Sequence, residues 1–273
     1  MERKQASIIT ETILIFVGLL FLFPILYLIQ MSFKHPGIFY KPFVLPDRLY
    51  LDYYSKAVNA KFFISLANSV FVTVGGLGLT ILLASMAGYT LARRQGKLFH
   101  IVFLLFMTGM IIPTVGSLIP LFKLVNSLHL GNTRTILVIL YTAGHIPMAT
   151  FLYSAFTKSI PRELEESAGM DGCGSFKMYW TIIFPLLLPA TGTFILTNVF
   201  GIWNDFVTPL IFLNSSEKMT LMPMIVQFMF NQQSVNYGPV FALCVLAMVP
   251  LLVLFVFTQR YMLKGLVVGS VKG

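Results

Sequence analysis

Six long stretches of the chain contain no charged residue. They cover residues 12–33, 62–92, 98–122, 135–157, 178–204 and 219–259. Each is longer than the roughly 20 residues that a helix needs to cross a bilayer. Backbone polar groups cannot stay unpaired in hydrocarbon, so such stretches are expected to be helical. The pattern predicts an all-α, polytopic membrane protein with six transmembrane helices, at about residues 10–33, 66–92, 99–122, 135–157, 180–204 and 239–260.

Composition supports the membrane assignment. Hydrophobic residues make up 57% of the chain and charged residues 11%, against about 45–50% and about 25% in soluble domains. The net charge of +9 does not indicate a nucleic-acid partner, because no basic run exceeds two residues. Cys173 and Cys244 lie far apart and give no metal spacing. The lipid bilayer is the expected partner, with no metal and no nucleic acid.

The basic residues favour an orientation with both termini in the cytoplasm. If they lie there, the inner segments carry eleven of the nineteen Lys and Arg residues, mostly near span ends. Residues 1–273 then form a single transmembrane domain. Residues 159–178 face the cytoplasm between the fourth and fifth spans, and residues 214–238 face outward. The outer segment contains TLMPMIVQFMF, which is too short for a further span and is expected to be interfacial or re-entrant.

The segment ELEESAGMDGCGSF, residues 163–176, concentrates four of the ten acidic residues of the chain. Carboxylates in the first turns of a helix are stabilised by the helix dipole, and Gly172 permits a turn. The segment is therefore predicted to be a helix–turn–helix. The alternative without a specific function is an amphipathic linker helix that lies on the membrane. A helix on an anionic leaflet should prefer Lys and Arg, whereas this segment is mostly acidic. We interpret the segment as a docking element.

Four residues in or near the spans are candidates for a translocation path. Asp205 is the one acidic residue at the edge of a span, flanked by Trp203 and Asn204. An intramembrane carboxylate is a functional hypothesis by default, although a structural role near the outer interface is slightly favoured. His145 lies in the fourth span before Pro147. A packed or pore-facing histidine is favoured there over a proton carrier.

Small residues crowd the second span. Gly75, Gly76 and Gly78 are followed by the pair Ala84 and Gly88. Such patterns let helices pack closely in lipid. The second span is thus expected to face another helix, either in this chain or in a partner subunit.

The acidic segment and the residues after it, EESAGMDGCGSFKMYWTIIFPLLLPA, resemble the signature loop of binding-protein-dependent ABC importer permeases. That signature is a Glu-Ala-Ala triplet, a Gly four residues later, and an Ile-x-Leu-Pro. Glu166-Ser167-Ala168, Gly172 and Ile182-Ile183-Phe184-Pro185 keep the spacing, with Ser for Ala and Phe for Leu. Further resemblance lies in NSVFVTV, ASMAGYTLARRQGK, IWNDFVTPLIF and QRYMLKGLVVGSVKG. Together these are similar to the MalG-type permeases of carbohydrate uptake systems.

The resemblance implies a mechanism and a set of partners. The loop would be a coupling helix that sits in a cleft of an ATP-binding cassette ATPase dimer. Its residues would be Glu165, Glu166, Ser167, Ala168, Asp171 and Gly172, with Glu166 contacting the ATPase and Asp171 holding the loop. A MalF-type second permease and an extracellular or periplasmic substrate-binding protein complete the assembly in a bacterial inner membrane. The cargo implied is an oligosaccharide, a monosaccharide or a polyol derivative.

The chain itself is not expected to be an enzyme or to bind a cofactor. A phosphate-binding loop needs G-x-x-x-x-G-K-[ST], and Leu98 follows the single Gly-Lys pair, Gly96-Lys97. ATP would be used by the partner subunit. The alternatives are a secondary transporter, which should show coupling-ion carboxylates or inverted repeats, and a membrane enzyme. Neither accounts for the spacing of residues 166–185.

Overall fold

The computed structural model describes residues 2–41, 43–112, 114–230 and 237–270, and the described residues form helices joined by turns. The chain divides into two compact units. Unit 1 comprises residues 1–63 and 224–250, and unit 2 comprises residues 64–223 and 251–273. The expected all-α fold is confirmed. That the two units form one transmembrane domain stays a prediction.

Unit 1 contains the N-terminal helix α1 (Glu2–Ser32), a 3-10 turn η1 (Pro36–Ile38), α2 (Asp52–Ala57), most of α12 (Leu221–Phe230) and the first half of α13 (Gly238–Ser270). The ring of Tyr53 on α2 packs directly against Gly238 at the start of α13. Lys34 is fully buried beyond the end of α1, and its ammonium donates to the carbonyl of Lys41 at 2.6 Å. The aromatic segment after α1 is held against α2 by the Tyr50 and Tyr53 rings, with centroids 4.8 Å apart, and against α13 by the Phe39 and Phe241 rings, with centroids 5.9 Å apart.

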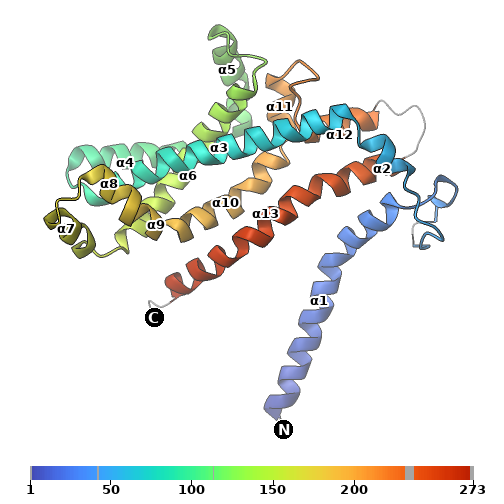
Figure 1. Ribbon diagram of the computed structural model, residues 1–273, viewed down its shortest axis with the longest axis horizontal. Helices are drawn as coiled ribbons and strands as arrows, with labels where there is room; N and C mark the ends of the chain where they lie inside the picture. The colour runs from blue at the N-terminus through green and yellow to red at the C-terminus, as the bar shows by residue number, and fades with distance from the viewer. Residues whose placement is uncertain (1, 42, 113, 231–236, 271–273) are drawn as a thin grey trace. The chain divides into compact units, whose positions relative to one another are not determined.

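Unit 2 is built around α6 (Arg134–Lys158). The unit also contains most of α3 (Ala60–Arg93), the start of α12 and the second part of α13. Its remaining elements are α4 (Lys97–Gly109), α5 (Thr114–Ser127), α7 (Glu163–Met170), α8 (Ser175–Met178), the π-helical turn η2 (Tyr179–Ile183), α9 (Phe184–Leu186), α10 (Leu188–Trp203) and α11 (Val207–Phe212). Helices α4, α10 and α11 contact α6. Figure 1 shows α7 and α8 at one end of this unit and α11 at the other.

The glycines of α3 explain how closely α3 packs on α6. A Cβ on Gly75 would lie 3.0 Å from the Val138 side chain. One on Gly88 would lie 2.7 Å from Cβ of Tyr153 and 2.9 Å from the backbone of α6. The expectation that small residues of the second span face another helix is thus confirmed for these positions, and the partner helix belongs to the same chain.

Within the described residues, four helical segments are long and apolar enough to cross a membrane, at Thr10–Ser32, Ala60–Arg93, Arg134–Lys158 and Gly238–Gln259. A fifth candidate is the pair Ser175–Leu186 and Leu188–Trp203, which is bent by 64°. Pro189 lacks the N–H that a continuous helix would use, so a bend at Leu187 costs little in hydrogen bonding.

The expected third span is not one helix. Instead of a continuous helix over 99–122, the structure has α4, which ends at Gly109, and α5, which begins at Thr114, with turn residues described at 110–112. Position 113 is a proline, and the residue before a proline is disfavoured in the α conformation. The stretch is still apolar, which is why its charge pattern alone predicted a single span. Six spans and cytoplasmic termini stay predictions.

Candidate functional site: the acidic helix and its attachment

Helix α7 forms where the sequence places its acidic cluster. Glu163, Glu165 and Glu166 all lie in its first turn, where free backbone N–H groups and the helix dipole stabilise negative charge. The helix ends because Gly172 adopts a φ of 75°, a left-handed conformation that glycine reaches without steric cost. The N–H of Cys173 then donates to the Ala168 carbonyl at 2.9 Å. The predicted helix–turn–helix is present, continuing into α8.

One carboxylate of α7 attaches the helix to the end of α3. Oε1 of Glu165 accepts a hydrogen bond from Nε of Arg93 at 2.6 Å, and Oε2 accepts one from the Tyr89 hydroxyl at 3.0 Å. Arg93 also donates through Nη2 to the Ile160 carbonyl at 2.8 Å. The Arg93 and Glu165 side chains are 12% and 16% exposed. Charge-assisted bonds shielded from water are stronger than neutral ones, so this ion pair fixes the orientation of α7.

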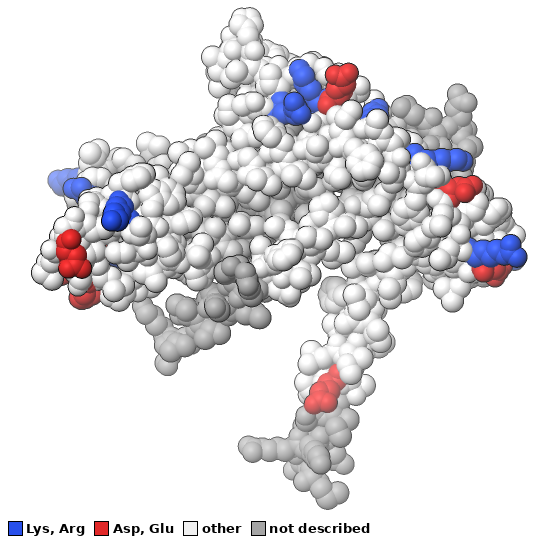
Figure 2. Space-filling model, in the orientation of Figure 1, with Lys and Arg blue, Asp and Glu red and all other residues white. Residues whose placement is uncertain are grey.

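The neighbouring residues of α7 divide between interior and surface. Ala168 is 7% exposed and packs inside unit 2, so its small side chain is not on the surface of the loop. Glu166, Ser167 and Asp171 are exposed. The carboxylate of Glu166 has no hydrogen-bond partner within the described part of the chain. Figure 2 shows red acidic side chains at this end of unit 2, with blue basic side chains close by.

Apolar side chains accompany the exposed acids. Leu164 is 44% exposed, Met170 83% and Phe176 71%. Large exposed apolar residues beside charged ones are typical of a surface that binds another protein. The loop therefore presents a mixed acidic and apolar surface on a helix whose position is fixed by Glu165.

The structure brings two of the predicted path residues together through Tyr141. The Tyr141 hydroxyl donates to Oδ2 of Asp205 at 2.9 Å, and Nδ1 of His145 contacts the Tyr141 carbonyl at 2.6 Å. Oδ1 of Asp205 accepts from the N–H groups of Val207 and Thr208 at 2.9 and 3.2 Å. The carboxylate thus caps the start of α11 and ties it to α6.

The other two predicted path residues lie at the end of α10. Trp203 is 5% exposed, within the last turn of that helix. Asn204 is its C-terminal capping residue and is exposed. Among the described residues, no three His, Cys, Asp or Glu side chains are grouped as metal ligands would be.

Sequence reasoning missed three residues of these sites. Arg93 and Tyr89 sit at the end of the second span, more than seventy positions before Glu165. Tyr141 lies in the middle of an apolar run. Their roles come from the packing of α3, α6 and α7. The hydrophobic periodicity of one helix does not indicate such a contact between helices. An arginine at the end of a span could, however, have suggested an ion pair with the acidic loop.

Several helices long and apolar enough to cross a membrane, together with an exposed acidic helix, are features of a multi-pass membrane protein. Residues 76–267 match the family described as the binding-protein-dependent transport system inner membrane component. The chain belongs to that family. Membership supports the importer hypothesis over the secondary transporter.

Two relatives from Bacillus subtilis (strain 168) are similar over nearly their whole lengths. The melibiose/raffinose/stachyose import permease protein MelC is 36% identical over 252 residues, which cover 92% of this chain and 91% of MelC. The arabinooligosaccharides transport system permease protein AraQ is 34% identical over 267 residues, covering 94% of this chain and 92% of AraQ.

A solved structure shares the fold. It is a bacterial ABC transporter involved in the import of the acidic polysaccharide alginate. One of its chains matches with a TM-score of 0.80 and 23% identity, covering 94% of this chain and 96% of that one. At this identity the match establishes the fold alone.

Proposed function

We propose that this chain is a permease subunit of an ATP-driven importer that carries a sugar, either an oligosaccharide, a monosaccharide or a polyol derivative, across a bacterial inner membrane. Family membership supports the transport role, and the names of MelC and AraQ support a carbohydrate cargo. A second permease, an ATPase dimer and an extracellular or periplasmic binding protein complete the assembly. The chain binds no cofactor, and ATP is hydrolysed by the partner subunit.

Coupling to the ATPase is assigned to residues 163–172. This assignment rests on the different environments of two adjacent glutamates on α7. Glu165 forms an ion pair with Arg93, whereas Glu166 is exposed and unpaired within the described residues. Helix α7 is attached to α3 on one side and exposed on the other, so a movement of a partner docked on the exposed side can be transmitted to α3. Such a transfer needs a rigid element whose position both partners bias.

The Tyr141 link supports a structural role for Asp205. Its carboxylate accepts three hydrogen bonds that join α6 to α11, and a carboxylate so occupied is well placed to fix a helix junction. A lining role for Trp203, Asn204, Asp205 and His145 in the translocation path stays a prediction.

The coupling assignment is tested by purifying the tagged chain in mild detergent and identifying the proteins that accompany it. We expect an ATPase with a phosphate-binding loop and a second permease in fixed ratio. Glu166→Ala should weaken binding of the ATPase or uncouple its hydrolysis from uptake. The matched control is Glu217→Ala, which removes an exposed carboxylate from the segment between α11 and α12.

Two results would count against the proposal. Equal loss of the ATPase in Glu217→Ala and Glu166→Ala would mean that net charge, not the loop, matters. A homogeneous chain that carries a sugar without any ATPase would remove the importer assignment itself.

A further inference from the structure

A cavity lies at the end of unit 2 opposite α7. Its volume is about 340 Å³, and it opens between the turn after α5 and the segment after α11. With the predicted orientation this end faces outward. Ligand sites in proteins span about 300–1,000 Å³, so the space suits a small solute of one or two rings.

The wall of the cavity is fixed by Asn132. This residue adopts a φ of 55°, and its Oδ1 accepts from the N–H groups of Asn214 and Ser215 at 3.1 and 3.2 Å. Its Nδ2 donates to the Ser215 hydroxyl at 2.7 Å, and its carbonyl accepts from the ammonium of Lys218 at 2.7 Å. Through these hydrogen bonds Asn132 holds the turn after α5 against the segment after α11. The cavity between them is therefore preformed.

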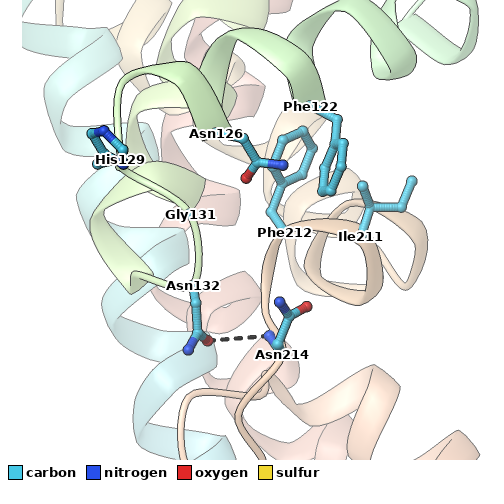
Figure 3. A pocket seen from close by; sticks show the side chains of 8 residues that line it. All are labelled: Phe122, Asn126, His129, Gly131, Asn132, Ile211, Phe212 and Asn214. Carbon is cyan, nitrogen blue, oxygen red and sulfur yellow. Dashed lines mark hydrogen bonds between the residues drawn. The ribbon is translucent and has the colours of Figure 1, made fainter.

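Two other amides on the cavity are free to bind. Asn126 and Asn214 are both exposed, and neither side chain has a hydrogen-bond partner in the described ranges. Figure 3 shows both amides over the space between the two segments, with Phe122 and Phe212 beside Asn126. The two phenylalanine rings are 6.1 Å apart between centroids, and Phe122 is 40% exposed.

We propose that this cavity is a binding site for a neutral saccharide. No Lys, Arg, Asp or Glu is among the described residues that line it, and His129 is the one lining residue among them that can carry a charge. The cavity therefore offers no permanent counter-charge to an ionic ligand. Each amide supplies both a donor and an acceptor, which matches adjacent sugar hydroxyls. The exposed aromatic ring offers an apolar surface to the C–H face of a sugar. A protein partner would need roughly 800 Å² of contact surface on this chain, far more than this concavity provides.

The site extends the proposed function without depending on the coupling loop. It would place a saccharide subsite on this subunit, outside the region of Tyr141 and Asp205. Uptake coupled to ATP can therefore be demonstrated while this inference fails, and the two experiments separate the two claims.

The test is binding of melibiose to the full chain in lipid nanodiscs, measured by saturation-transfer NMR. Asn126→Ala combined with Asn214→Ala should weaken binding about tenfold, the factor expected for two lost hydrogen bonds. Gly131→Ala should also weaken it, because a Cβ there would lie 3.0 Å from Oδ1 of Asn126. The matched control is Asn198→Ala, an amide that bonds within its own helix.

The control should bind melibiose as tightly as the unaltered chain, and neither should bind glucuronate. Circular dichroism and thermal unfolding establish that the variants are folded. Equal binding of melibiose by the unaltered chain and the double variant would overturn the site. So would the absence of saturation transfer from the unaltered chain to melibiose at about 10 mM, beyond the millimolar range of weak specific binding.

Discussion

Removal of the Glu165 carboxylate should detach α7 from α3 without unfolding the spans. In Glu165→Ala the guanidinium of Arg93 keeps its bond to the Ile160 carbonyl but loses its counter-charge. The Tyr89 hydroxyl loses its acceptor. Helix α7 itself remains a good helix, because Glu163 and Glu166 still occupy its first turn.

The size of the effect depends on the burial of the pair. Hydrogen bonds to charged groups contribute about 1.5–3 kcal/mol each, and breaking a fully buried pair costs about 3–5 kcal/mol. The side chains of Arg93 and Glu165 are 12% and 16% exposed, so part of the loss is recovered by water. We therefore expect a net cost of about 2 kcal/mol. A difference of about 1.4 kcal/mol is tenfold in an equilibrium constant, which gives roughly 30-fold more detachment.

Hydrogen exchange measured by mass spectrometry over residues 161–178 reports this detachment directly, since exchange depends on local opening. The control is Glu163→Ala, whose exposed carboxylate contributes only about 0.3–1 kcal/mol through the helix dipole. Combining Glu165→Ala with Arg93→Ala should give less than the sum of the single effects. Equal exchange in Glu165→Ala and Glu163→Ala, or additive single effects, would refute the attachment.

Three further predictions concern the packing of unit 2. Gly88→Ala should lower the free energy of unfolding by about 1–3 kcal/mol, because the new methyl group would meet the backbone of α6. Gly78→Ala should leave it unchanged, because no atom lies within 4 Å of a Cβ at that position. Thermal unfolding in detergent measures both. Asp205→Ala should speed hydrogen exchange over residues 206–213 by about tenfold, the effect of losing about 1–2 kcal/mol of hydrogen bonding, whereas unchanged exchange would show that Asp205 is not the cap. Asn132→Ala should raise exchange in both cavity segments together, and a rise in one segment alone would contradict the clamp.

The long helices were predictable because their signal is local. Hydropathy over some twenty residues is enough to locate α1, α3, α6 and α13. The observed ends lie within a few residues of those expected, except at the N-termini of α1 and α3 and the C-terminus of α13. Breaks were less predictable. The sequence shows prolines at 113, 185 and 189, but proline also occurs inside intact helices, as at Pro147 in α6. Whether a proline breaks a span depends on neighbouring helices.

The acidic site was predictable in outline. The acidic first turn and Gly172 indicate a helix and its end on local grounds. The distinct roles of Glu165 and Glu166 were not predictable, because adjacent glutamates look alike until α3 is placed beside one of them. The burial of Ala168 was hidden for the same reason. Close packing by a small residue can serve a partner or the chain itself.

The importer assignment is tested most directly by uptake of radiolabelled raffinose into proteoliposomes that contain this chain with its co-purified partners. We predict uptake that requires ATP on the cytoplasmic side of the vesicle membrane and the binding protein on the other side, and that is reduced by Glu166→Ala. Uptake driven by an ion gradient, without ATP or a binding protein, would contradict the assignment.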